Sequence, residues 1–239
     1  CLLMTMESPT TAAGGELESY FSLGLTVSHS QKDNAEFPKV LLLLSAYLDK
    51  TVQQNEELLD SSKIKESTTI FHGQRVPELS IKLYAERIFK YAKCSPSCFV
   101  LALIYMERYL QQPNIYMTSF SVHRLLITSV VVAAKFIDDA FFNNAYYGRV
   151  GGISTREMNM LELDLLFGLD FRLKVDIETF ESYCLQLEEA LVLVLERPIQ
   201  VQEANVTKHL ICNSSADETC KHELGLERYS SQAVQGCSW

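Results

Sequence analysis

The sequence predicts an all-α protein, and two features of the chain lead to that prediction. Apolar residues recur at helical spacing over several long segments, whereas no segment alternates apolar and polar residues for long enough to form a sustained strand. The ends of these segments coincide with Ser, Asp, Pro and Gly residues that are typical of helix boundaries. The 239 residues are 47% apolar and 21% charged, with ten glycines and six prolines, which is the composition of a folded globular protein.

The chain divides into five parts by composition and periodicity. Residues 1–36 show no sustained period and are expected to form a flexible arm. Residues 37–59 carry apolar residues at helical spacing, followed by a polar run, which predicts an amphipathic helix outside the main domain. Residues 60–76 are polar and irregular and predict a connector. Residues 77–195 contain five predicted helices that pack together, and residues 196–239, with few large apolar side chains, are expected to be mostly disordered.

The first three helices of the predicted bundle are defined by their apolar patterns. The first covers about residues 78–92 and has one apolar stripe. The second covers residues 95–110, where Ser95 followed by Pro96 is typical of an N-cap and a first helical residue. The third covers about residues 118–136. Because the second and third are apolar on nearly every side, they are expected to lie at the centre of the bundle.

The last two helices have clear start signals. Ser154 followed by Glu157 predicts a capping box, in which each of the two side chains accepts a hydrogen bond from a backbone amide of the other residue. That helix is expected to end at Gly168. The fifth helix is expected to begin at Asp176 and to reach about residue 195.

Charge and cysteine content exclude several classes of function. The net charge is −9 and no three consecutive residues are Lys or Arg, which argues against binding to nucleic acid or to a membrane surface. The longest apolar stretches, residues 40–48 and 125–134, are too short to span a bilayer. The start of the chain lacks the pattern of a signal peptide, and the seven cysteines include no CxxC pair. We therefore expect a protein of the nucleus, the cytoplasm or both, which is not secreted.

A search for catalytic, metal-binding and cofactor-binding patterns gives no strong candidate. The glycine-rich residues 148–152 match no phosphate-binding loop and follow no predicted strand, so they are interpreted as a tight connector that needs positive φ. Asp138 and Asp139 form an acidic pair, but adjacent carboxylates at a helix end point in different directions and no histidine is near them in sequence. The sequence therefore predicts neither an enzyme nor a metal or cofactor site.

Two charged residues do not fit the apolar periodicity around them. Lys135 follows the apolar end of the third helix, and Glu162 lies between two leucines of the fourth. One explanation is that Lys135 complements its helix C-terminus and Glu162 reaches water. The other is that both face outward into a recognition surface with an apolar rim, formed by residues that share their helix faces: Val132, Phe136 and Leu166.

Several ordered motifs resemble a known family. The residues Val132-Ala-Ala-Lys-Phe136, Leu161-Glu-Leu163 and Leu169-Asp-Phe171, on successive helices, resemble the cyclin box. Residues 121–127, 143–152 and 180–184 are more narrowly similar to the plant U-type, also called P-type, cyclins, which are similar to the fungal phosphate-response cyclin. The resemblance covers about residues 38–195 and allows only one cyclin box, because too few residues follow it for a second.

The resemblance implies a non-catalytic subunit that binds and activates a cyclin-dependent kinase. In cyclins, the lysine and glutamate that match Lys135 and Glu162 lie on the surface that grips the C helix of the kinase. The apolar contacts of the family map onto Val132, Phe136, Leu166 and Leu173. The implied partner is a plant A-type cyclin-dependent kinase, and the implied role is cell-cycle and cell-division control or phosphate signalling.

Two other functions stay open at this point. A cyclin-fold module associated with transcription would bind other components without activating a kinase, and it would be expected to have basic helix faces and two boxes. A small helical enzyme would require a cluster of catalytic residues that the sequence does not contain.

Overall fold

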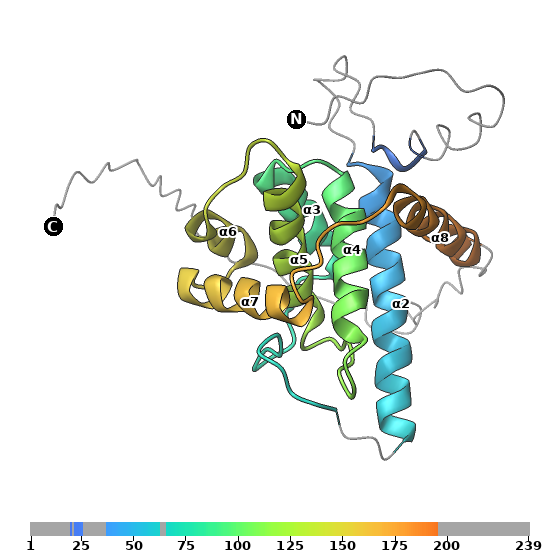
Figure 1. The fold of residues 1–239 in the computed structure, drawn as a ribbon. Coiled ribbons are helices and arrows are strands. Elements are labelled where there is room, and N and C mark those ends of the chain that lie inside the picture. The colour runs from blue at the N-terminus through green and yellow to red at the C-terminus, as the bar shows by residue number, and fades with distance from the viewer. Residues whose placement is uncertain (1–19, 21, 26–36, 63–65, 196–239) are drawn as a thin grey trace, which may run out of the picture. The chain divides into compact units, whose positions relative to one another are not determined.

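Helices make up the regular secondary structure of the part of the chain that the structure describes, as predicted (Figure 1). This computed structural model describes residues 20, 22–25, 37–62 and 66–195. Within those residues there is no strand, and seven α-helices have eight residues or more: α2 (Lys39–Ser61), α3 (Ile81–Ala92), α4 (Ser97–Leu110), α5 (Val122–Ile137), α6 (Asn144–Gly151), α7 (Thr155–Gly168) and α8 (Ile177–Leu195). The expected disordered tail, residues 196–239, and most of the expected flexible arm lie outside the described residues.

Helices α4 and α5 form the centre of the core, in agreement with their all-round apolar pattern. Every residue from Cys98 to Met106 in α4 is buried, and so is every residue from Leu125 to Ala134 in α5. Helix α4 packs against α2 on one side and against α5 on the other (Figure 1). Close packing of large apolar surfaces is the dominant stabilising contribution in such a core.

Helix α2 belongs to the same core, so its predicted place outside the main domain is wrong. Its apolar residues at positions 40, 44, 48 and 52 are buried, and the helix packs against α3, α4 and α8. The predicted amphipathic pattern is confirmed. The helix was expected outside the domain because a polar connector separates it from the next helix in the sequence. In the folded structure α2 nevertheless packs against the other helices.

Helix α6 was not predicted, because its segment contains three glycines. Asn143 is its N-cap, and the side-chain oxygen of Asn143 accepts a hydrogen bond from the Tyr146 amide at 3.0 Å. Close packing explains why glycine occupies positions 148 and 151 of this helix. A Cβ at Gly148 would lie 2.8 Å from the Ile153 carbonyl oxygen, and one at Gly151 would lie 3.1 Å from the Ile127 side chain. The expected positive φ is found at Gly152 alone within residues 148–152, where it ends α6.

Residue 20 and residues 22–25 are packed against the helices, which corrects the expectation of a flexible arm for these few residues. Leu23 is fully buried, and the Tyr20 hydroxyl donates to Glu181 of α8 at 2.8 Å. Gly24 has a φ of 73°, which turns the chain after Leu23. The arm was expected to be flexible because one buried leucine and one tyrosine give no periodic signal.

The start of α7 follows the sequence prediction in part. The Ser154 hydroxyl accepts from the Glu157 amide at 3.1 Å, as expected of an N-cap. The Glu157 carboxylate does not return to Ser154 but pairs with Arg124 of α5 at 2.6 Å. The cap therefore forms one half of the predicted box, and the other half is replaced by a contact between helices.

Candidate interaction surface

The two charged residues that broke the apolar pattern meet on the surface between α5 and α7. The Lys135 Nζ lies 2.6 Å from the Glu162 Oε1. Lys135 is in the last turn of α5, and its side chain is 26% exposed, whereas that of Glu162 is 17% exposed. Both side chains are therefore partly buried.

A third residue, Asn144, completes the polar cluster. Its side-chain oxygen accepts from Lys135 Nζ at 2.7 Å, and its side-chain nitrogen donates to Glu162 Oε2 at 2.5 Å and to Asn159 at 2.8 Å. Asn144 is the first residue of α6, so the helix that sequence analysis missed supplies this contact. The polar pattern of Asn143 and Asn144 before two tyrosines was the signal that marked a helix start here.

The apolar residues predicted around the pair differ in exposure. Phe136 is 50% exposed, and Leu166 and Leu173 are half-buried. Val132 is only 3% exposed, so it supports the surface from beneath and does not form part of its rim. Val132 is buried because it faces the centre of the bundle from α5, where α4 and α7 also pack.

An apolar groove of about 270 Å³ lies next to Phe136. Phe136 and Leu173 line it, together with residues that the sequence did not assign to this surface: Tyr20, Ser97, Leu101, Ile137, Val175, Asp176, Ile177 and Phe180. Apart from Tyr20, which precedes the first of the seven helices, these residues come from the terminal turns of helices and from the segment between α7 and α8, where periodicity carries little information. Their assembly into one groove depends on the tertiary structure.

The segment between α7 and α8 is held in place by α4. The Tyr105 hydroxyl donates to the Leu173 carbonyl oxygen at 2.8 Å, and the Arg108 Nη1 donates to the carbonyl oxygens of Arg172 at 2.9 Å and Lys174 at 3.3 Å. Burial raises the pKa of Tyr105 above its usual value, which keeps the hydroxyl protonated as a donor. These contacts give Leu173 a defined position beside the groove.

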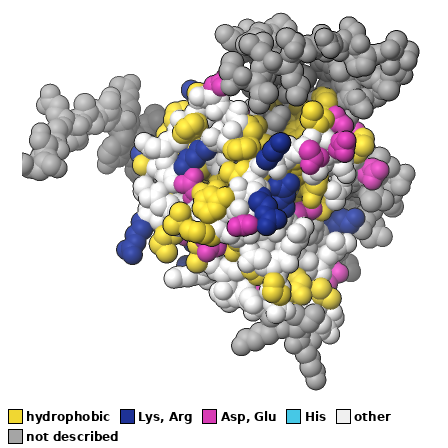
Figure 2. All heavy atoms as spheres, in the orientation of Figure 1, with side chains coloured by type: hydrophobic (Ala, Val, Ile, Leu, Met, Phe, Trp, Pro, Cys, Tyr) yellow, Lys and Arg dark blue, Asp and Glu magenta, His cyan; other side chains and the backbone are white. Residues whose placement is uncertain are grey.

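Hydrophobic side chains also gather over α7 and the residues that follow it (Figure 2). Phe167 is 65% exposed and Phe171 is 55% exposed, and their rings meet edge to face with centroids 5.3 Å apart. Asp170 and Phe171 both have positive φ, at 51° and 56°, which is uncommon for residues other than glycine. The turn that presents Phe171 to solvent is therefore a strained one.

Removal of the Tyr105 hydroxyl is expected to loosen this anchor. The Tyr105→Phe variant should lose about 1 kcal/mol of unfolding free energy, because the Leu173 carbonyl loses a buried hydrogen bond. Urea denaturation measures the change. Tyr91→Phe is the matched control, since the Tyr91 side chain is exposed and its hydroxyl has no partner among the described residues. Equal stability of Tyr105→Phe and wild type would contradict the anchoring role.

The polar groups of this surface, Lys135, Glu162 and Asn144, are hydrogen-bonded to one another, which is an arrangement suited to binding a partner. Among the described residues, no three His, Cys, Asp or Glu side chains are grouped so as to hold a metal ion. Asp138 accepts from the Ser95 amide at 3.0 Å and from Cys98 Sγ at 3.3 Å, so it ties the end of α5 to the start of α4. In the described ranges no helix has both the length and the apolar character needed to cross a membrane.

The fold is all-helical, with a partly exposed ion pair beside an apolar groove, and the sequence comparisons show the family to which such a chain belongs. A sequence model of the family described as Cyclin matches residues 38–173, from the start of α2 to the residue beside the groove. The chain therefore belongs to the cyclin family. Cyclins are regulatory proteins that act with cyclin-dependent kinases, and they are not themselves enzymes.

Within this family, the resemblance to plant P- and U-type cyclins is confirmed. The chain is 78% identical to Cyclin-P3-1 of Oryza sativa subsp. japonica over 223 residues, which are 92% of this chain and 94% of the relative. It is 45% identical to Cyclin-U4-1 of Arabidopsis thaliana over 186 residues, which cover 77% of this chain and 90% of that protein. It is 47% identical to Cyclin-U3-1 of Arabidopsis thaliana, with 71% of this chain and 76% of the relative covered.

Proposed function

We propose that this chain binds a cyclin-dependent kinase through the surface around Lys135 and Glu162 and thereby activates it. The observation that carries the proposal is the position of this ion pair, partly exposed on two neighbouring helices and close to exposed Phe136. A charged pair of this kind, surrounded by apolar side chains, fixes the register of a partner while the apolar area provides most of the burial.

The chemistry of the pair suits a kinase helix and the loop before it. Lys135 can donate to backbone carbonyl oxygens, and Glu162 can accept from backbone amides, when the partner excludes water from the pair. The groove beside Phe136 and Leu173 accepts an apolar side chain of the partner. In the proposed complex, docking favours the kinase state in which the C-helix glutamate pairs with the lysine that positions ATP.

The proposed partner is a plant A-type cyclin-dependent kinase, and the proposed setting is cell-division control or phosphate signalling in the nucleus or cytoplasm. Membership of the cyclin family supports a cyclin-dependent kinase as the partner, and the similarity to plant P- and U-type cyclins supports a plant kinase. The proposed activation requires no catalytic group from the cyclin, because activity follows from the shift in kinase conformation.

The test is reconstitution from purified proteins. The full chain is mixed with the kinase, and the mass of the complex is measured by light scattering after size exclusion. Phosphorylation of histone H1 is then compared with and without the cyclin. We expect a 1:1 complex with raised kinase activity. A complex without raised activity would favour a binding module that does not activate, and the lack of any complex would contradict the proposal.

A further inference from the structure

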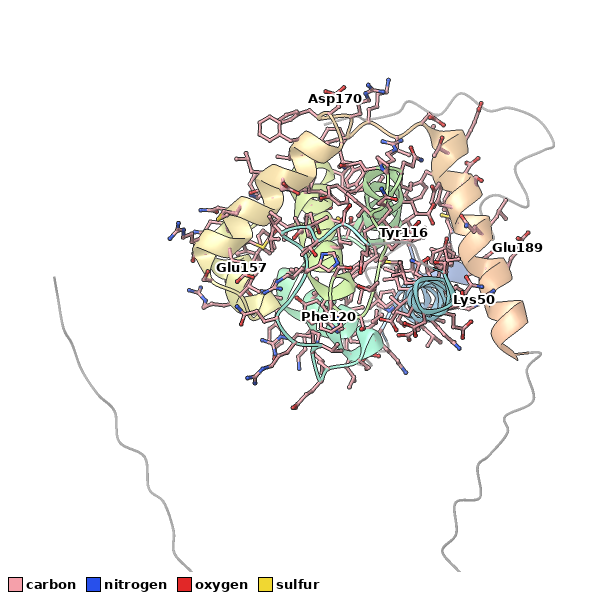
Figure 3. The ribbon with its side chains drawn as sticks, turned by 90° about the horizontal axis from the view of Figure 1, so that it is seen from below. Lys50, Tyr116, Phe120, Glu157, Asp170 and Glu189 are labelled. Atoms are coloured by element: carbon pink, nitrogen blue, oxygen red, sulfur yellow. The ribbon has the colours of Figure 1, made fainter. Side chains whose placement is uncertain are left out.

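A second exposed surface lies on the solvent-facing side of α7. Met160, Leu163 and Phe167 are each more than half exposed there, and the Phe171 ring extends the row through its contact with Phe167. Figure 3 shows α7 along one edge of the molecule, with Asp170 just beyond the end of the helix. A contiguous row of large apolar side chains that are this exposed indicates contact with another molecule.

The row has the spacing of a seam between two paired helices. From Arg156 through Met160, Leu163 and Phe167 to Asp170, steps of four and three residues alternate. This spacing keeps side chains on one narrow face of a helix, along which a second helix can pack. The buried residues of α7 lie outside this series, so the described residues cover only one of its two apolar faces. We refer to the five residues of the series as the α7 stripe.

The two ends of the α7 stripe carry opposite charges. Arg156 is exposed and makes no hydrogen bond or ion pair with the described residues. Asp170 is paired with Arg172 at 2.9 Å, but both side chains are 79% exposed. An ion pair that is so exposed contributes little to stability, so Asp170 can take another cationic partner at little cost.

The α7 stripe is complementary to itself in the antiparallel orientation. Leu163 lies midway between Arg156 and Asp170, seven residues from each. A second copy that runs antiparallel would therefore place unlike charges together at both ends, with Met160 facing Phe167. A parallel copy would place Arg156 beside Arg156 and Asp170 beside Asp170, and like charges repel.

A shallow pocket at the Arg156 end adds shape to this charge pattern. It has a volume of about 180 Å³, and Ile70 and Met160 are among the residues that line it. In the antiparallel pair, the end of the second copy that lies opposite the pocket carries Phe171. The pocket can therefore receive this ring. A strained turn that presents an aromatic ring to solvent, as at Phe171, is typical of a binding site.

The acidic residues beside the α7 stripe are already engaged within their own chain. Glu157 pairs with Arg124 at 2.6 Å, and Asp164 accepts a hydrogen bond from the Tyr109 hydroxyl at 2.9 Å. Their carboxylates are thus directed toward the body of the domain, which limits repulsion between two copies.

The α7 stripe lies beside the surface proposed to bind the kinase and is distinct from it. Glu162 and Leu163 are consecutive residues, and consecutive residues of a helix point about 100° apart. Lys135 and Asn144, which contact Glu162, belong to other helices and are not part of the α7 stripe.

We propose that the α7 stripe is a self-association surface, on which a second copy of this chain binds antiparallel through its own α7 stripe. The two-fold axis passes near Leu163, and Arg156 of each copy pairs with Asp170 of the other. Because the same patch is used on both copies, the contact closes at a dimer. The surface is small, so we expect a weak dimer with a dissociation constant on the order of 10–100 µM.

The experiment is sedimentation equilibrium of the full chain, from a few micromolar to several hundred micromolar. We expect the mean mass to rise with concentration from that of a monomer to that of a dimer. Leu163→Arg should weaken the dimer by about tenfold or more, because it places like charges together at the axis. Leu185→Arg on α8 is the matched control, since Leu163 is 55% exposed and Leu185 is 54% exposed, and it should change the affinity less than about twofold.

A charge exchange tests the antiparallel orientation. Arg156→Asp should weaken the dimer by about threefold or more, because each end then carries two carboxylates. Arg156→Asp/Asp170→Lys should restore the affinity to within about threefold of the wild type, because unlike charges meet again. Lysine suits position 170, since Lys93 has the same positive φ of 51° as Asp170. Urea denaturation confirms that each variant is folded.

Four results would overturn the proposal. A chain that stays monomeric at every concentration would leave the α7 stripe to a helix of another protein. A dimer that Leu163→Arg does not weaken, or that Leu185→Arg weakens equally, would form through a different surface. A double variant no stronger than Arg156→Asp would contradict the antiparallel pairing. Lys135→Ala/Glu162→Ala should dimerise as the wild type does, so failure here is distinct from failure of the kinase proposal.

Discussion

Exchange of the two charges in the variant Lys135→Glu/Glu162→Lys is expected to abolish kinase binding while the fold stays intact. The intramolecular ion pair is retained, with its two charges on the opposite helices. Asn144 has both a donor and an acceptor in its amide, so it can serve the exchanged pair after rotation of the amide group. A partner helix would meet a carboxylate where it presents carbonyl oxygens, and an ammonium where it presents amides.

The expected loss is at least about 100-fold in affinity, because the partner's buried polar groups lose their hydrogen bonds and face like charges. Lys135→Ala/Glu162→Ala should also weaken binding strongly, through loss of the same contacts. Isothermal titration with the kinase measures both variants, and urea denaturation confirms that each is folded. If the exchanged variant binds the kinase as well as the wild type does, the pair has only a structural role between α5 and α7.

The second large effect is expected at Gly168, the last residue of α7. A Cβ at this position would lie 2.5 Å from the Cδ2 and Cε2 atoms of Tyr109. The Tyr109 ring has little freedom to move: it is 3% exposed, its hydroxyl donates to Asp164 at 2.9 Å, and it packs edge to face on Phe71 with centroids 5.0 Å apart. Gly168→Ala should therefore lower the free energy of unfolding by about 1–3 kcal/mol.

A double-mutant cycle separates this steric effect from other causes. In a Tyr109→Ala background the ring is absent, so Gly168→Ala should have no cost or should stabilise the helix by up to about 1 kcal/mol through its higher helix propensity. Urea denaturation of the four proteins measures the coupling. A cost of Gly168→Ala that is the same in both backgrounds would show that contact with the ring is not its cause.

Most of the helices could be predicted because their signals are local. Ser154 accepts a hydrogen bond from the Glu157 amide, as the predicted N-cap, and the apolar spacing of α3, α4 and α5 matches their buried residues. The first helix of the bundle begins at Ile81 after the N-cap Ser80, three residues later than predicted. Helix α6 escaped prediction because two of its glycines are required by contacts with residues distant in sequence. Local propensity disfavours glycine in a helix, and close packing here outweighs that cost.

The candidate site was predictable only in part, for a similar reason. Lys135 and Glu162 stood out because each is a charge in an apolar pattern, yet nothing local indicates that they bond to each other or to Asn144. Val132 was expected at the rim because it shares a helix face with Phe136, but packing buries the inner part of that face. The concave surface lined by Arg75, Arg87 and Arg124 gave no sequence signal, since these residues belong to separate segments.

The amino-acid sequence by itself determined the all-α class, most helix boundaries, the family and the two charges that mark the surface. These depend on periodicity, capping and side-chain type, which act between residues close in the chain. Only the tertiary structure decided that α2 joins the core, that α6 is a helix, which apolar residues stay exposed, and that three distant arginines share one recess. Those features arise from contacts between residues far apart in sequence, and such contacts exist only once the helices have packed.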